Sequence, residues 1–193
     1  MPAFALTSGA TMADIPPLPH RRTIRFEGFD YSQAACYFVT ICAREKQLLF
    51  GKICDSRMQF NVLGRIVSES LIDIPNHFAS AEIPVHAIMP NHLHSILVLR
   101  ERARHAVPLL NQSRHAEAFG EPVAGSIPTI IRSFKAAVTR KARAMLERPS
   151  LEVWQRNYFE RVIRNEDEFR KTWQYICENP AKWDFDPDNP RHR

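Results

Sequence analysis

The amino-acid sequence predicts an α+β protein in which helices pack on one face of an antiparallel β-sheet. Three observations lead to this fold class. The chain has 193 residues, of which 45% are hydrophobic, enough for one compact domain with a core. Short β-branched runs and longer segments with helical periodicity both occur. Their order is strand, strand, helix, strand, strand, helix, strand, helix, and this order favours a sheet of antiparallel strands.

Prolines and polar residues mark the segments that we expect to lie outside the core. Residues 1–20 contain four prolines and no hydrophobic periodicity, so they predict a mobile tail. Residues 101–125 are mostly charged or small and predict a long loop. We therefore expect one domain over residues 21–183, followed by a C-terminal tail over residues 184–193.

The first half of the domain combines four strands with one helix. The strands are rich in β-branched, aromatic and other apolar residues, and the second is expected to return antiparallel to the first. They cover residues 37–42, 47–53, 83–89 and 92–100. Between the second and third strands, Asn61 is a good N-cap for a helix that runs to about Ile74 and ends before Pro75.

The second half is predicted to contain two helices and a short strand. Apolar residues recur at helical spacing over residues 128–146. Residues 153–163 mix aromatic and basic side chains and are expected to include a short strand. The last helix begins at Asn165, where Glu168 three residues later completes a capping-box-like pattern, and it should end before Pro180.

The composition restricts the class of protein. The formal net charge of +5 fits a polyanionic partner but does not require one. No apolar run approaches the roughly 20 residues that span a bilayer, and the first residues lack the basic start of a signal peptide, so we expect no membrane association. The four cysteines form no Cys-x-x-Cys pair, and reduced thiols in the cytoplasm are the expected state.

The clearest candidates for chemistry are His92 and His94 in the motif MPNHLH. Residues two apart in a strand project from one face, so both imidazoles lie close enough to hold one divalent metal ion. Two ordinary strand histidines would give the same pattern. A second group is therefore needed to support a metal site.

That second group lies at the end of the last predicted helix. The buried stripe of this helix is expected to consist of Phe169, Thr172, Trp173 and Ile176. Tyr175 lies on the flank of the stripe, and Asn179 lies one turn further along the same flank. Tyr175 can place its hydroxyl in a cleft, or it can be a boundary aromatic. Asn179 can supply a hard metal ligand, cap the helix, or do both.

Together these groups suggest a reaction at a phosphodiester. With Mg²⁺ or Mn²⁺ on His92 and His94, a phosphate oxygen could occupy an open coordination position. The hydroxyl of Tyr175 would attack phosphorus, form a phosphotyrosine and release a sugar hydroxyl. A second hydroxyl could reseal the link without a nucleotide cofactor, because the covalent intermediate retains the energy of the cleaved bond.

Five short stretches occur in order over residues 22–183. They are GFDYS (28–32) with YFVTIC (37–42), MPNHLH (89–94), SFK (133–135), VWQRNYFE (153–160) and YICENP (175–180). As an ordered set they resemble the HUH single-tyrosine transposases, and most closely the REP-associated tyrosine transposases.

The resemblance implies a ferredoxin-like fold and a single-strand DNA endonuclease that cleaves and rejoins DNA at palindromic hairpins through a 5′-phosphotyrosine. It gives His92 and His94 the role of metal ligands, and Tyr175 that of the nucleophile. Asn179 matches the helical polar position that completes the metal site. Related insertion-sequence transposases often form dimers, whereas REP-associated members can act as monomers, so a monomer and a homodimer both remain open.

Basic and aromatic side chains between these motifs are the expected DNA contacts. The basic face of helix 128–146 either contacts phosphates or is simply solvated, and the aromatic residues of 153–160 either pack or stack on bases. The expected contact residues are Arg132, Lys135, Arg140, Lys141, Arg143, Trp154, Arg156 and Tyr158. Tyr158 also competes for the role of nucleophile, and we prefer Tyr175 because Asn179 follows it by one turn.

Two other functions stay open at the level of sequence. A non-catalytic hairpin-DNA-binding protein derived from a transposase would bind with strong salt dependence and cleave nothing. A metal hydrolase of small phosphoesters would not need Tyr175, and the chain lacks an evident carboxylate cluster of the kind found at two-metal sites.

Overall fold

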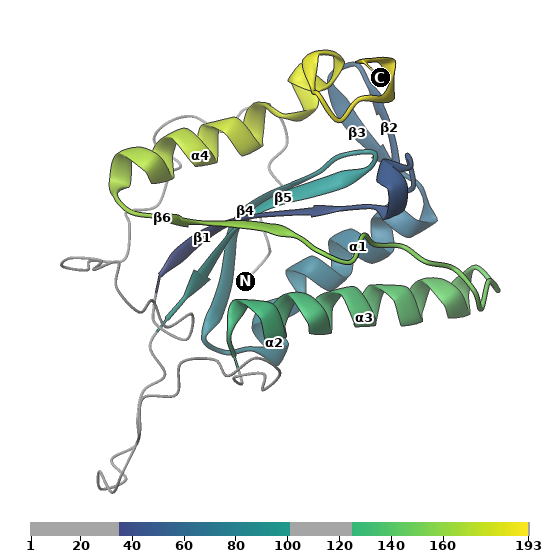
Figure 1. Cartoon of the computed structure of the whole chain (residues 1–193), viewed down its shortest axis with the longest axis horizontal. Helices are drawn as coiled ribbons and strands as arrows, with labels where there is room; N and C mark the ends of the chain where they lie inside the picture. The colour runs from purple at the N-terminus through teal and green to yellow at the C-terminus, as the bar shows by residue number, and fades with distance from the viewer. Residues whose placement is uncertain (1–34, 101–124, 193) are drawn as a thin grey trace, which may run out of the picture.

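The computed structural model of the chain describes residues 35–100 and 125–192, which form a four-stranded sheet between two layers of helices (Figure 1). The expected tail at 1–20 and nearly all of the expected loop at 101–125 lie outside these residues. Within the described ranges, no helix is both long and apolar enough to cross a membrane.

All four strands of the sheet are antiparallel, in the order β4-β5-β1-β6. β1 (Cys36–Cys42) is central and pairs with β5 (His92–Leu99) on one side and with β6 (Phe159–Ile163) on the other. β4 (Ala81–Ile88) and β6 are the edges. The antiparallel α+β class predicted from the sequence is confirmed.

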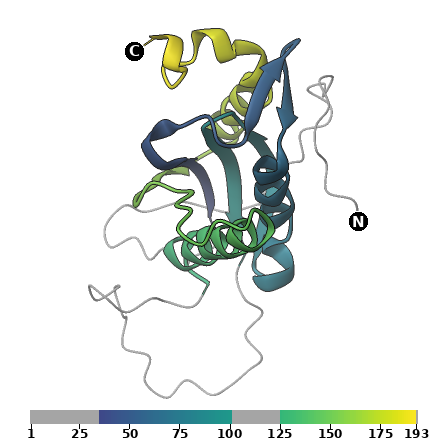
Figure 2. The ribbon, with the colours of Figure 1, turned by 90° about the vertical axis from the view of Figure 1, so that its right-hand side faces the viewer.

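The strand predicted at 47–53 does not return along β1. A 3-10 helix η2 (Arg44–Lys46) follows β1, and β2 (Gly51–Cys54) then pairs with β3 (Arg57–Phe60) in a separate hairpin. Figure 2 shows this hairpin next to the C-terminal segment. The apolar pattern indicated an extended segment, but such a pattern does not specify which strand is the partner.

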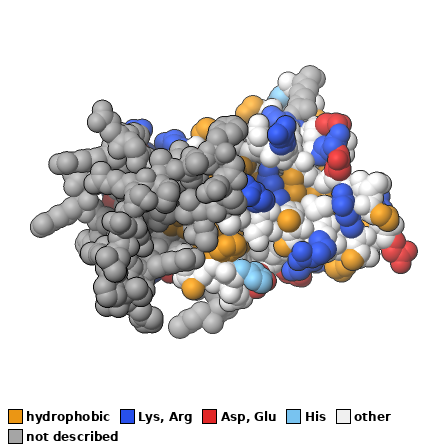
Figure 3. All heavy atoms as spheres, turned by 60° about the horizontal axis from the view of Figure 1, so that its bottom comes forward, with side chains coloured by type: hydrophobic (Ala, Val, Ile, Leu, Met, Phe, Trp, Pro, Cys, Tyr) orange, Lys and Arg blue, Asp and Glu red, His pale blue; other side chains and the backbone are white. Residues whose placement is uncertain are grey.

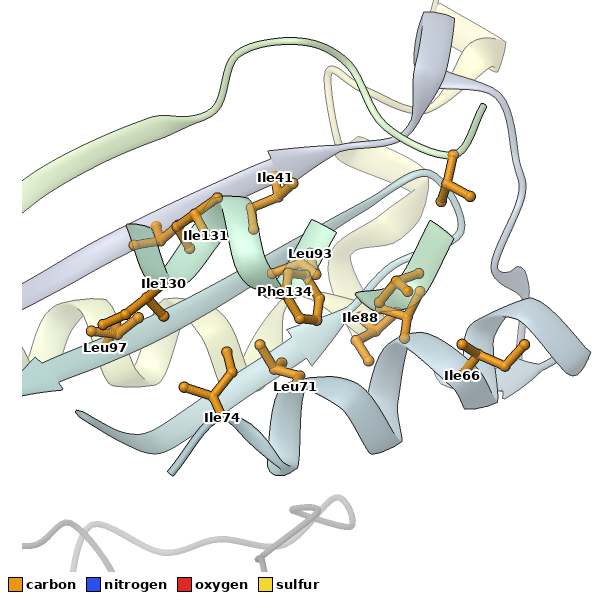
Figure 4. Close-up of a cluster of buried hydrophobic side chains, with 14 of the residues drawn as sticks. Ile41, Ile66, Leu71, Ile74, Ile88, Leu93, Leu97, Ile130, Ile131 and Phe134 are labelled. Atoms are coloured by element: carbon orange, nitrogen blue, oxygen red, sulfur yellow. The ribbon is translucent and has the colours of Figure 1, made fainter. Parts of the chain in front are cut away.

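Three helices cover the first face of the sheet, two of them at the predicted positions. α1 (Val62–Ile72) starts where expected, because the N–H of Gly64 donates to Asn61 Oδ1 at 2.9 Å. A short helix, α2 (Ile74–His77), follows it. α3 (Ile127–Met145) packs beside α1. Figure 4 shows the core on this side, where Ile41 and Leu93 of the sheet meet Phe134 of α3.

The last helix lies on the opposite face, which corrects the prediction that the helices share one face. α4 (Glu166–Glu178) begins as expected, with the N–H of Glu168 donating to Asn165 Oδ1 at 2.8 Å. It then packs over β4 and β5. Its residues Trp173 and Ile176 join Ile96 in a second, smaller core. The sheet therefore separates two helical layers (Figure 1).

The expected C-terminal tail is part of the fold. The chain continues from α4 through the 3-10 helices η3 (Pro180–Phe185) and η4 (Pro190–His192). Trp183 and Asn189 are buried, and Asn189 Nδ2 donates to the carbonyl of Trp183 at 3.0 Å. This segment closes over the start of β5, where the histidines lie.

Candidate metal and nucleophile site

His92, His94 and Tyr175 meet on the α4 face of the sheet. Because side chains alternate along β5, both histidines project from one face of the sheet and Leu93 projects from the other. Their rings are 4.6 Å apart between centroids, with exposed fractions of 1% and 6%. α4 brings the hydroxyl of Tyr175 to 3.4 Å from His94 Nε2. The structure therefore brings together the two histidines and the tyrosine named from the sequence.

Asn91 fixes the hydrogen-bonding state of His92. Its Nδ2 donates to two backbone carbonyls, that of Lys46 at 3.1 Å and that of Asp188 at 2.7 Å. Only Oδ1 is left to face His92 Nδ1, at 2.8 Å, and an amide oxygen can only accept. His92 Nδ1 therefore carries the proton, and Nε2 presents its lone pair to the site.

His94 is held by residues of β1. Thr40 lies directly across the sheet from it, and the Thr40 hydroxyl oxygen is 2.8 Å from His94 Nδ1. The ring of Phe38 stacks on the imidazole, with centroids 5.3 Å apart and planes 23° from parallel. These contacts occupy Nδ1 and one ring face, and they leave Nε2 directed at Tyr175.

Burial keeps both imidazoles neutral. Removal from water lowers the pKa of His92, and the carboxylates of Asp186 and Asp188 oppose this shift only in part. Burial also holds the pKa of His94 well below its ordinary value, and the neighbouring His92 lowers it further. The neutral imidazole is the form that binds metal, so the pair needs to lose no proton at neutral pH.

Asp186 is a site residue that the sequence analysis missed. Its Oδ2 lies 3.7 Å from His92 Nε2, a buried atom with no hydrogen-bond partner in the described chain. The neighbouring Asp188 forms an ion pair with Lys46. A signal was available in DFDPDN near the end of the chain, where acidic residues alternate. The sequence predicts a tail over residues 184–193, and only the fold brings this segment to the histidines.

The donor set fits a divalent cation. A buried imidazole nitrogen without a partner is costly, and a metal ion would satisfy it. Within the described ranges, His, Cys, Asp and Glu side chains do not gather in a group of three that could hold a metal. Two imidazole nitrogens alone do not complete a coordination shell, so a cation held there would need further oxygen ligands.

Asn179, the third ligand expected from the sequence, caps α4 one turn beyond Tyr175. It is buried, with 4% of its surface exposed, and its backbone N–H points to the carbonyl of Ile176 at 3.4 Å. Of the two roles expected for Asn179, the structure confirms that of helix C-cap. Its role toward a metal stays a prediction.

Five of the six basic residues expected to contact DNA lie across the sheet from the histidines. These five belong to α3, on the first face: Arg132, Lys135, Arg140, Lys141 and Arg143. Lys135 is half-buried, and its Nζ donates to the backbone carbonyls of residues 155–157 at 2.9, 3.3 and 3.0 Å. It therefore anchors the segment before β6. Arg143 Nε similarly donates to the carbonyl of Leu151 at 2.9 Å.

The two aromatic residues expected to stack on bases pack against the protein. Trp154 is half-buried, and its ring lies 5.2 Å from that of Phe50 and 5.5 Å from that of Phe134. Tyr158 packs on the same core, with Lys135 Nζ 5.7 Å from its ring centre. Both occupy the first face, so Tyr158 is separated from the histidines by the sheet. Arg156 is exposed.

The fold and this site together define a class: an α+β protein whose sheet carries a buried histidine pair beneath a helical tyrosine. The chain is 39% identical over 167 residues to an uncharacterised protein of Haemophilus influenzae, a match that covers 86% of this chain and 92% of that protein. The chain belongs to the same family as that protein. No family model matches it.

A solved structure of a REP-associated tyrosine transposase bound to a REP hairpin has the same fold. The TM-score is 0.51 at 18% sequence identity, and the match covers 86% of this chain and 74% of that one. At this identity the likeness concerns the fold. The resemblance to REP-associated tyrosine transposases found in the sequence motifs is thus confirmed at the level of the fold.

Proposed function

We propose that this protein cleaves and rejoins single-stranded DNA beside hairpins, with Tyr175 as the nucleophile. The observation that carries the proposal is the 3.4 Å approach of the Tyr175 hydroxyl to His94 Nε2, next to His92 Nε2, which has no hydrogen-bond partner among the described residues. A tyrosine poised at a buried, neutral histidine pair is the arrangement that metal-assisted attack on phosphorus requires. The fold shared with a transposase solved on a REP hairpin supports the same substrate class.

The residues divide the reaction between them. His92 and His94 would hold Mg²⁺ or Mn²⁺, with Asn179 as an oxygen ligand, and the bound ion would supply Lewis acidity at the phosphate. The oxygen of Tyr175 forms a bond to phosphorus while the bond to the 3′ oxygen of the preceding sugar breaks. The phenolic proton leaves to solvent, which reaches the half-exposed Tyr175, and the departing 3′ oxygen takes up a proton. A free 3′-hydroxyl can later reverse these steps.

The basic residues of α3 are proposed to contact flanking DNA away from the scissile phosphate. Figure 3 views the molecule from the α3 side and shows separate Lys and Arg side chains on this surface. A shallow hollow of about 740 Å³ lies along α3, lined in part by Lys135, Arg140 and Arg143. Arg132, Arg140 and Lys141 are exposed, and Arg156 is exposed beyond the end of the helix. Such side chains give affinity without reading sequence.

The cysteines fit a reducing compartment. All four are free in the structure, at positions 36, 42, 54 and 177. We therefore propose that the reaction takes place in the cytoplasm, where thiols stay reduced.

The test is covalent capture of DNA. The protein is incubated with hairpin oligonucleotides that carry randomised single-stranded flanks, in Mg²⁺ or in Mn²⁺, and denaturing gels detect a protein–DNA adduct. Wild type and Tyr158→Phe should form the adduct, and Tyr175→Phe should lose it by at least about a thousandfold.

Two results would contradict the proposal in different ways. An adduct formed by Tyr175→Phe at the wild-type level would refute the nucleophile. Hairpin binding by wild type without an adduct in either metal would instead establish the alternative, a non-catalytic hairpin-binding protein.

A further inference from the structure

The edge strand β6 places an exposed aromatic residue on the α4 face of the sheet, which we call the histidine face because it carries His92 and His94. Phe159, the first residue of β6, pairs with Thr40, whose hydroxyl contacts His94. Side chains alternate along β6, so Arg161 and Ile163 share the face of Phe159. Ile163 belongs to the core under α4, which confirms which face this is. Phe159 is nevertheless 55% exposed.

One aromatic ring, that of Phe38, lies between Phe159 and the proposed nucleophile Tyr175 and contacts both. The ring of Phe159 contacts that of Phe38 edge-on, with centroids 6.3 Å apart. Phe38 in turn contacts Tyr175 edge-on at 6.0 Å and stacks on His94 at 5.3 Å. A flat group resting on Phe159 would therefore lie one aromatic ring away from the reacting hydroxyl.

The surroundings of Phe159 favour a polyanionic strand. Arg161 is exposed two residues further along the same face, and its guanidinium donates to Thr172 Oγ1 at 3.4 Å. β6 is an edge of the sheet, so within the described residues no strand pairs with its outer side. An exposed aromatic ring followed by a cation is the combination that holds single-stranded DNA, because bases stack and phosphates pair with the charge.

We propose that Phe159 is the stacking platform for a nucleobase next to the scissile phosphate, with Arg161 holding a phosphate of the same strand. The proposal rests on the proposed function and adds to it the path of the cleaved strand next to the scissile phosphate, which runs along β6. Every base has a π-face, so this platform positions the strand without selecting its sequence.

The test distinguishes binding through the bases from binding through the phosphates. Fluorescence anisotropy measures binding of the full chain to a short oligothymidine strand and to an abasic phosphodiester strand of the same length. Phe159→Ala should weaken oligothymidine binding roughly tenfold and leave the abasic strand within about twofold. Phe159→Trp should restore the lost affinity. Met145→Ala is the matched control, because Met145 is 66% exposed at the far end of α3.

Refutation of base stacking on Phe159 can be distinguished from refutation of DNA cleavage. Equal weakening of both strands by Phe159→Ala, no weakening of oligothymidine binding, or no oligothymidine binding by wild type would each refute stacking. Base-dependent loss in Phe159→Ala, together with a wild type that forms no covalent adduct, would support the platform and refute cleavage.

Discussion

The two faces of the sheet are built from alternate residues of the same strands, yet they differ in kind. Leu93 lies in an entirely hydrophobic core with α1 and α3, whereas His92 and His94 on either side of it lie among polar and aromatic groups under α4. The alternation of a strand thus puts stability and chemistry one residue apart. Neighbouring positions of β5 should therefore fail in different ways when they are substituted.

The largest expected effect is on the first face. Leu93→Ala should lower the free energy of unfolding by about 2–5 kcal/mol, because it removes buried methyl groups and leaves a cavity in the core. Denaturant titration measures this loss. The folded fraction of the variant should still bind Mn²⁺ like wild type. Unchanged stability, or loss of metal binding by the folded protein, would contradict the claim that the first face determines stability and the histidine face metal binding.

The next largest effect is expected on the histidine face, where substitution of Asn91 should weaken Mn²⁺ binding. Asn91→Leu removes the acceptor that fixes the proton on His92 Nδ1, so Mn²⁺ affinity should fall by about 10–100-fold. Asn91→Asp keeps an acceptor toward Nδ1 and should lose less. Calorimetric titration with Mn²⁺ compares the variants, with circular dichroism as the control for folding. A folded Asn91→Leu protein with wild-type affinity would show that Asn91 does not position His92.

The histidine pair should also add to the acid sensitivity of the apo protein, to which burial of His86, which lowers the pKa of that imidazole, contributes as well. His92 and His94 have folded pKa values below their ordinary value, so the unfolded chain binds more protons than the folded one in that range. Unfolding free energy should level off near pH 7 and fall as pH drops below 6.5, by up to about 1.4 kcal/mol per pH unit for each histidine.

Denaturant titrations in chelator across this range measure the slope. The His92→Gln and His94→Gln variants should each flatten it, whereas His77→Gln, which alters an exposed histidine, should not. A slope that is the same in all four proteins would contradict the assignment.

The smallest effect concerns the α3 surface. Arg132→Gln and Arg140→Gln should each weaken hairpin binding a few-fold and reduce the slope of log K against log salt by about 1. Their adduct yield at saturating DNA should match wild type, because they lie across the sheet from Tyr175. Salt-dependent anisotropy measures both quantities. A salt slope identical to wild type in both variants would remove α3 from the DNA surface.

The sequence predicted the local features well because local physics determines them. Asn61 and Asn165 cap helices where their side chains can reach the first free N–H groups. Alternation along β5 put His92 and His94 together, and helical spacing placed Tyr175 at the edge of a buried stripe. Each of these rests on contacts within a few residues or on one element's periodicity.

The remaining features depend on tertiary contacts that periodicity does not encode. Nothing in residues 47–53 specifies β3 as their partner, and an amphipathic helix such as α4 fits either face of a sheet. The sequence also does not show that Trp154 packs on Phe50 and Phe134, or that Lys135 holds three carbonyls. Asp186 was missed because only the fold returns its segment to His92.

The most direct test of the account is a titration of the folded protein with Mn²⁺, followed by electron paramagnetic resonance. Wild type and Leu93→Ala should each bind one ion per chain, and His92→Ala and His94→Ala should each lose that binding. Mn²⁺ binding by His92→Ala and His94→Ala equal to that of wild type would contradict a metal site on the α4 face.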